Sequence, residues 1–235
     1  MSAPDAPDAP DAACAADGLT LLHTSPVHVP VFDALRDRHH PGTALRHLVV
    51  PGLLARARVA GPAAVAGEIE SLLAGQGSGD GAVLCTCSTI GAVAEDLGPA
   101  LGRQVLRVDR PMAAAAVRTG PRIAVLATVE STLAPTLALL REEADALDRA
   151  RPGYAASLSL RPQVVPGAWE RFEAGDDAGC LGLVAAAADA VTGADVIVLA
   201  QVSMAGAVER ATTDIPLLSS PSVGLAAAVG ALRRA

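Results

Sequence analysis

Cys87 is the residue of this sequence that is best placed for chemistry. It lies in the segment CTCSTIG, residues 85–91, which follows an apolar run of strand length and precedes a run of helical length. Ser88 and Thr89 are suited to cap the predicted helix, and the first N–H groups and the dipole of a helix stabilise a nearby anion. We therefore expect a reactive thiol at Cys87, beside N–H groups that can receive a substrate carboxylate.

The cysteines also have a structural interpretation, because free cysteine is often a small buried core residue. Position alone leaves both interpretations of Cys87 open, whereas Cys85 lies on the strand side and is expected to point into the sheet. With Cys14 and Cys180 the chain has four cysteines, and their spacing shows no disulfide framework. Few cysteines and no recognisable signal peptide indicate a reduced, cytoplasmic protein.

Small hydroxyl residues follow a predicted strand in each half of the chain. Thr24 and Ser25 come after the first strand, and Thr128, Ser131 and Thr132 come after a strand of the second half. Such side chains are ordinary loop and cap residues, but they also donate hydrogen bonds to a carboxylate. Their paired placement favours a ligand site.

The histidines give no metal site. His39, His40 and His47 form no ligand set with the cysteines at zinc-site spacing, so we predict that no metal is bound. His23 and His28 flank the first hydroxyl loop and could line a cleft there, although a core or surface role is the more common one for such residues.

Composition excludes several classes of function. The 235 residues are 51% hydrophobic but only 2% aromatic, so Ala, Val and Leu must fill the core. A net charge of −7 argues against binding to nucleic acid, and no apolar run is long enough to span a membrane. All 18 basic residues are arginine, which excludes a lysine Schiff base and a P-loop lysine.

Strand-length apolar runs alternate with longer helical stretches after residues 1–17, a Pro-Asp-Ala-rich leader that we expect to be disordered. The expected strands are Leu19–His23, Leu45–Val50, Ala82–Cys85, Gln104–Val108, Arg122–Ala127, Ser157–Val164, Asp195–Ala200 and Pro216–Ser219. The expected helices are Val31–Arg38, Pro62–Ala74, Ile90–Leu101, Pro111–Arg118, Leu133–Ala150, Asp177–Thr192, Ala205–Arg210 and Pro221–Arg233. Continuous apolar strands that alternate with helices predict an α/β protein with parallel sheets.

The chain also reads as two halves with one plan, a first α/β lobe over 18–117 and a second over 118–220. In each half a later apolar strand runs into a loop of small polar residues, at 85–89 and at 200–204. We therefore predict two pseudo-symmetric lobes, each a parallel sheet flanked by helices, with the active-site cleft between them. Residues 221–235 form a C-terminal helix whose candidate packing surface is the first lobe.

With these loops assembled, residues 19–233 resemble the aspartate/glutamate racemase superfamily, which includes hydantoin racemases, maleate isomerase and arylmalonate decarboxylase. The segment 87–89, Cys-Ser-Thr, is similar to the family's first-lobe Cys-Asn-Thr motif. The segment 201–204, Gln-Val-Ser-Met, stands in the place of the second-lobe motif Cys-Thr-Gly/His. The resemblance implies that the substrate is bound by Thr24, Ser25, Ser88, Thr89, Thr128, Ser131, Thr132, Val202 and Ser203.

In the racemases of this family two cysteine thiols exchange a proton on opposite faces of the substrate α-carbon, and no cofactor is needed. Here Gln201 stands where the second thiol is expected, which argues against a symmetric two-base racemase. Members with one thiol, such as arylmalonate decarboxylase, offer a template in which a single cysteine acts, and this chain keeps its cysteine in the first lobe.

The resemblance thus implies a cofactor-independent isomerase-like or racemase-like enzyme that acts on a small carboxylate-bearing molecule through Cys87, with Gln201 in the place of the second cysteine. Two alternatives remain: a decarboxylase of a malonate-type acid, and a non-catalytic carboxylate-binding protein that lost the second cysteine. The family also makes a homodimer a candidate assembly.

Overall fold

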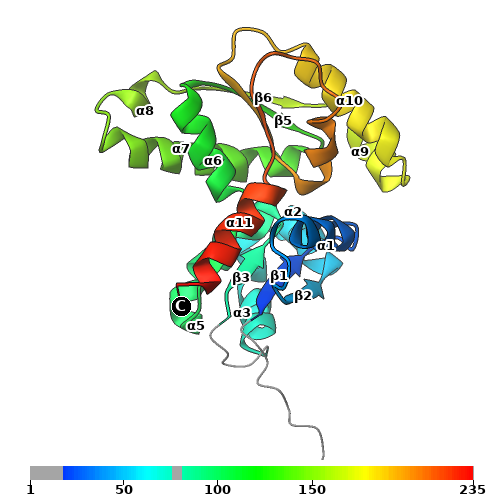
Figure 1. Cartoon of the computed structure of the whole chain (residues 1–235), viewed down its shortest axis with the longest axis vertical. Helices are drawn as coiled ribbons and strands as arrows, with labels where there is room; N and C mark the ends of the chain where they lie inside the picture. Colours follow the sequence, from blue (N-terminus) through cyan, green and yellow to red (C-terminus); the bar gives the residue numbers. More distant parts are fainter. Residues whose placement is uncertain (1–17, 76–80, 235) are drawn as a thin grey trace, which may run out of the picture.

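Two α/β lobes lie one above the other in the computed structural model, which describes residues 18–75 and 81–234 (Figure 1). Each lobe contains a four-stranded parallel sheet flanked by helices. The predicted fold class is therefore confirmed. The expectation of a disordered leader over 1–17, with Cys14 in it, lies outside the described residues.

The first sheet is built from four short strands in the order β2-β1-β3-β4, of which the two central ones are fully buried. Every residue of its central strand β1 is buried, which explains why this strand reads as a continuous apolar run rather than an alternating one. The strands of this sheet are β1 (Leu19–His23), β2 (Leu45–Val49), β3 (Val83–Cys85) and β4 (Val105–Arg107).

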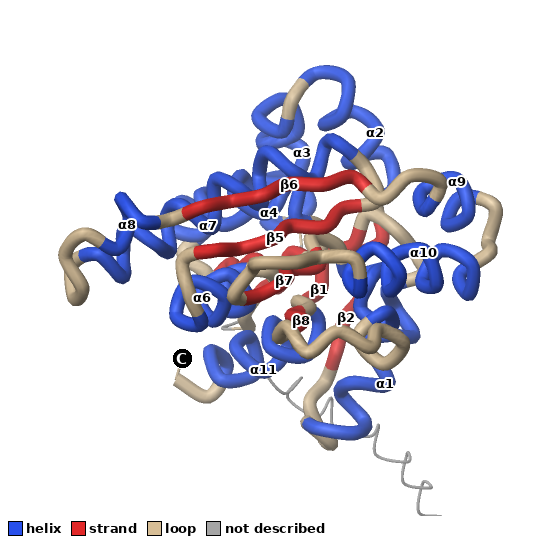
Figure 2. Tube along the Cα trace, turned by 90° about the horizontal axis from the view of Figure 1, so that it is seen from above, coloured by secondary structure: helices blue, strands red, loops and turns tan. Residues whose placement is uncertain are grey.

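The second sheet repeats the strand order of the first as β6-β5-β7-β8, again with parallel neighbours. Its strands are β5 (Arg122–Ala127), β6 (Ser159–Val164), β7 (Val196–Leu199) and β8 (Leu217–Leu218). Seen from above, the strands run through the middle of the molecule with helices around them (Figure 2). The loops that follow β1, β3, β5 and β7 are the four polar loops singled out in the sequence.

Helices connect the strands of both sheets. The first half contains α1 (His28–His39), α2 (Pro51–Ala60), η1 (Pro62–Val65), α3 (Ala66–Ala74), α4 (Ser88–Asp96), α5 (Gly98–Leu101) and α6 (Arg110–Thr119). The second half contains η2 (Glu130–Thr132), α7 (Leu133–Asp148), α8 (Tyr154–Ser157), α9 (Ala168–Glu173), α10 (Asp177–Asp189), η3 (Val202–Ala207) and α11 (Pro221–Leu232). None of the described helices is both long and apolar enough to cross a lipid bilayer.

Several of these elements differ from the sequence-based expectations, among them the four-residue helix α8, which was not expected. The helices α2 and α9 were not expected, because α2 buries only Leu53 and Ala57 and α9 has six residues, too few for a clear apolar period. The helix expected over Ala205–Arg210 is instead the 3₁₀ helix η3, which begins directly after Gln201.

One helix from each half of the chain packs against the sheet of the other half. The helix α6, which the expected boundary at 117 assigns to the first lobe, buries Met112 and Ala116 in the core of the second sheet, beside Val125. In return α11 packs Leu225 and Ala228 onto the apolar face of the first sheet. The packing therefore divides the chain differently from a single cut at residue 117.

Candidate active site

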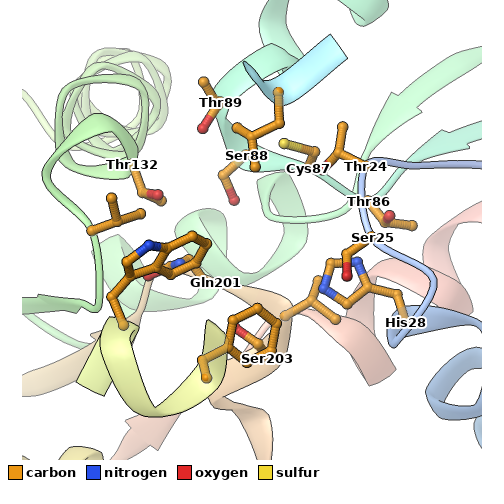
Figure 3. A pocket seen from close by; sticks show the side chains of 15 residues that line it. Thr24, Ser25, His28, Thr86, Cys87, Ser88, Thr89, Thr132, Gln201 and Ser203 are labelled. Carbon is orange, nitrogen blue, oxygen red and sulfur yellow. The ribbon is translucent and has the colours of Figure 1, made fainter. Parts of the chain in front are cut away.

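A small cavity opens where the polar loops of both lobes meet (Figure 3). Its volume is about 60 Å³; on the same measure one water molecule needs roughly 10–15 Å³, so a ligand portion of a few non-hydrogen atoms fits inside. The lining residues are Thr24, Ser25, His28, Leu54, Thr86, Cys87, Ser88, Thr89, Val129, Thr132, Trp169, Phe172, Gln201, Val202 and Ser203.

Cys87 reaches this cavity from the start of α4. It is the N-cap residue of that helix, with an extended backbone (φ −112°, ψ 114°), and its side chain is 8% exposed. The expectation that Ser88 or Thr89 caps the helix is wrong, because α4 begins at Ser88 and has no side-chain cap hydrogen bond. The first-turn N–H groups of α4 therefore keep their capacity to bind an anion next to the thiol.

Gln201 reaches the same cavity from the end of β7. Its Oε1 atom accepts two hydrogen bonds from Thr128, one from the backbone N–H at 2.6 Å and one from the hydroxyl at 3.0 Å. Thr128 thus fixes the amide through its oxygen, and the NH₂ group of Gln201, a residue of the cavity lining, takes no part in these bonds and keeps its donor capacity. An NH₂ donor suits a carboxylate or an enolate oxygen and does not exchange a proton as a thiol does.

Ser88 joins the two lobes at the edge of the cavity. Its hydroxyl donates a 2.9 Å hydrogen bond to the backbone carbonyl of Ala200, at the end of β7 in the second lobe. This bond holds the start of α4 close to Gln201. The Ser88 hydroxyl proton is therefore engaged, and only the oxygen lone pairs remain for a ligand.

The cavity brings together most of the site residues predicted from sequence, and their roles stay predictions. Thr24, Ser25, Thr89, Thr132, Val202 and Ser203 line it together with Cys87, Ser88 and Gln201. Two predicted residues lie behind the wall instead. Thr128 holds Gln201, and the Ser131 hydroxyl is buried without a hydrogen-bond partner.

Cys85 is unsuited to the role of the reactive thiol. It is fully buried, its Sγ donates to the carbonyl of Cys87 at 3.7 Å, and burial raises the pKa of its thiol. Cys180 is also buried in the core of the second lobe. Among the described residues no group of three or more His, Cys, Asp or Glu is placed to hold a metal ion.

Sequence reasoning missed the apolar wall of the cavity. Trp169 and Phe172 come from α9 and Leu54 from α2, and neither of these helices was expected. The whole chain has one Trp, one Tyr and two Phe, so half of its aromatic residues lie in one small cavity. Because aromatic residues are so rare in this sequence, the pair Trp169 and Phe172 could have been singled out as a candidate part of the site.

The two histidines beside the first loop have different environments. His23 is fully buried; its Nδ1 lies 2.8 Å from the Thr86 hydroxyl, its Nε2 lies 2.8 Å from Nδ1 of His47, and burial lowers its pKa to about 3. His28 does line the cavity, contrary to the core or surface role given more weight above. Burial lowers the pKa of His28 to about 4, so its imidazole is neutral at pH 7.

Comparison with solved structures finds several proteins built on the same plan. The chain is similar to glutamate racemase from Thermus thermophilus in complex with beta-chloro-D-alanine, with a TM-score of 0.65 and 19% identity over 93% of this chain and 81% of that chain. The aspartate racemase of Picrophilus torridus gives a TM-score of 0.65 and 14% identity over 92% of this chain and 94% of that chain. This chain has the fold of the aspartate/glutamate racemases.

A decarboxylase shares the racemase fold. A mutant of arylmalonate decarboxylase, in its sulfate-associated form, matches with a TM-score of 0.60 and 17% identity over 92% of this chain and 93% of that chain. No protein-family model and no curated protein matches the sequence itself. The resemblance inferred from the motifs is therefore confirmed at the level of the racemase fold.

Proposed function

We propose that this protein is a cofactor-independent enzyme of the isomerase or racemase type, which moves a proton at the α-carbon of a small carboxylic acid through Cys87. The observation that carries the proposal is the placement of one thiol and one amide donor in the same cavity. Cys87 stands at the first turn of α4, and Gln201 is fixed by Thr128.

The cavity offers what such a proton transfer needs. In one direction the Cys87 thiolate takes the proton from the α-carbon, and the electron pair of the broken C–H bond moves into the carboxyl group. The resulting enediolate carries extra negative charge on oxygen, which N–H donors stabilise most strongly when they are fixed in advance. The first-turn N–H groups of α4 and the NH₂ group of Gln201 are such donors.

The lining also indicates which acids fit. Among the described residues no Arg, Asp or Glu side chain lines the cavity, so a second carboxylate on the substrate finds no cation among these lining residues. Trp169, Phe172 and Leu54 instead form an apolar surface. The substrate class that suits both features is a monocarboxylate with an apolar substituent on its α-carbon.

The test is exchange of the α-proton with solvent. Both enantiomers of phenylglycine, phenylalanine, 2-phenylpropionate, aspartate and glutamate are incubated with the protein in D₂O and followed by NMR and chiral chromatography. We expect exchange with an apolar acid, and we expect Cys87→Ala to reduce the exchange rate of at least one enantiomer by roughly 100-fold or more. Cys85→Ala is the matched control. Full activity of Cys87→Ala would show that Cys87 is not the catalyst.

A decarboxylase of a malonate-type acid is the second candidate, because within residues 18–75 and 81–234 no second thiol lines the cavity with Cys87. In that reaction the bond to the leaving carboxylate breaks as CO₂, and Cys87 protonates the carbanion that remains. Release of CO₂ from phenylmalonate, lost in Cys87→Ala, would favour this reaction. Thermal stabilisation by these acids without any turnover would favour a non-catalytic carboxylate-binding protein.

A further inference from the structure

His28 is a buried titratable side chain that the reaction described above does not use. It lies at the first position of α1, is 8% exposed and lines the same cavity as Cys87. Its Nδ1 atom is buried and has no hydrogen-bond partner. In Figure 3 the His28 ring lies beside Ser25 and points into the cavity, and Cys87 lies farther up in the same view.

A purely structural role does not account for this histidine. Burying a polar atom without a hydrogen bond costs roughly 1–3 kcal/mol, and a Phe or Leu would fill the same space without that cost. His23, the neighbouring buried histidine, has a partner on each ring nitrogen. The contrast indicates that the missing partner of His28 is a ligand.

We infer that His28 is the second proton-transfer group of this enzyme and acts across the substrate from Cys87, in the role that Gln201 cannot fill. This inference rests on the proposed function. It changes the expected mechanism from one base to an unlike pair, a thiol and an imidazole.

The proton balance of this pair is simple. In one direction neutral His28 takes the α-proton, the electron pair of the C–H bond moves into the carboxyl group, and the Cys87 thiol returns a proton to the other face of the α-carbon. The protein then holds an imidazolium and a thiolate. In the other direction the thiolate takes the α-proton and the imidazolium returns one, so no further reactant is needed.

The surroundings keep His28 ready as a base. The titratable groups near it are His23, with ring centroids 6.1 Å apart, and Cys87 in the same cavity. Asp177 and Cys180 line a second cavity together with His28. Of the residues that the structure describes, no Asp or Glu lines the cavity that holds Cys87, and His28 forms no ion pair with Asp177 among the contacts found there. A bound carboxylate adds a negative charge beside His28 and thereby raises the pKa of its imidazole toward the value that proton transfer at neutral pH needs.

The test separates the two half-reactions in D₂O with the five acids named above. We expect His28→Gln to lose inversion of the α-carbon by roughly 100-fold or more, while exchange of the α-proton of one enantiomer through Cys87 is kept. Cys87→Ala is expected to exchange only the other enantiomer. This opposite enantiomer preference is a readout that a merely structural role of His28 does not produce.

His39→Gln is the matched control, because it is the same substitution at the exposed end of the same helix, and it should invert at the wild-type rate. Should His28→Gln fold poorly, His28→Ala with added imidazole replaces it, and rescue of inversion is expected. Inversion at the wild-type rate by His28→Gln, or loss of exchange for both enantiomers in a folded variant, would overturn the inference. A wild-type protein that exchanges no acid would instead overturn the proposed function itself.

Discussion

At the scale of single residues, the site is defined by the side chain that stands in place of the second thiol. Gln201 is fixed at its oxygen by Thr128, so the orientation of its amide is set before any ligand binds. A donor held in this way stabilises negative charge better than a mobile one, because it does not have to reorient when the charge develops. Gln201 is therefore better understood as an anion-binding group than as a lost base.

Replacing Gln201 by Glu tests this interpretation. The new side chain has nearly the same shape, but it presents a negatively charged oxygen where the NH₂ donor was. We expect the affinity for 2-phenylpropionate, measured by titration calorimetry, to fall at least 10-fold, about 1.4 kcal/mol. Gln104→Glu, the same change at an exposed position outside the cavity, should leave it unchanged. Equal affinity of Gln201→Glu and wild type would contradict the role.

The buried histidines predict a loss of stability in acid. Burial lowers the pKa of His23 to about 3 and of His28 to about 4 from an ordinary 6.5, so between these values the unfolded chain binds more protons than the folded one. Each histidine should therefore lower the free energy of unfolding by about 1.4 kcal/mol per pH unit as the pH falls below ~6.5.

Urea unfolding at pH 7 and pH 5 measures the contribution of His28. The loss of stability between these two values should be about 2 kcal/mol smaller for His28→Gln than for wild type. The exposed control His39→Gln should lose as much as wild type. An identical loss in His28→Gln would mean that His28 titrates normally in the folded protein.

At the scale of elements, the position of Cys87 depends on how α4 lies on β4. Gly91, in the first turn of α4, faces Arg107, and a Cβ atom at Gly91 would lie 3.1 Å from the Arg107 Cβ. Arg107 is buried and donates to both carboxylate oxygens of Asp109, at 2.7 and 3.0 Å. Because Gly91 has no side chain, the first turn of α4 can pack closely against β4, next to the buried Arg107–Asp109 ion pair.

The helix α11 offers a sharper prediction, because two of its glycines differ only in what they face. A Cβ at Gly224 would lie 2.4 Å from the backbone oxygen of Val108, whereas a Cβ at Gly230 meets only the end of the flexible Arg234 side chain at 3.4 Å. Gly224→Ala should lower the free energy of unfolding by roughly 1–3 kcal/mol. Gly230→Ala should raise it by up to about 1 kcal/mol. Chemical denaturation compares the two, and equal effects would contradict the close approach.

The sequence predicted the central strands β1, β3, β5 and β7 well because they are almost fully buried and read as mostly apolar runs, whereas the edge strands β2 and β6 are partly exposed. It also predicted that the loops carrying Cys87 and Gln201 face one another, because each loop follows the carboxyl end of a strand in its own lobe and the two pseudo-symmetric lobes share one cleft. It did not predict the α9 wall, since a six-residue helix has no measurable apolar period. Nor did it place His28, because residue type alone does not tell whether a histidine points into a cavity or into the core.

At the scale of the whole molecule, the lobes are connected by more than their linkers. Arg110 of α6 donates to Glu95 of α4 and to Glu143 of α7, the latter at 2.7 Å, and Ser88 bonds to the carbonyl of Ala200. With α6 packed on the second sheet and α11 on the first, neither lobe keeps a complete core without the other. We expect one cooperative unfolding transition. Assembly into a homodimer stays a prediction.

The apolar wall has one more consequence, which is optical. Trp169 is the single tryptophan of the chain, and it lies in the cavity wall on α9 with the guanidinium of Arg58, from α2 of the other lobe, 5.4 Å from its ring centre. Tryptophan fluorescence therefore comes from one position only, where α9 of the second lobe meets α2 of the first. The intrinsic fluorescence of Trp169 can therefore report ligand binding in the cavity and separation of the two lobes, without any attached dye.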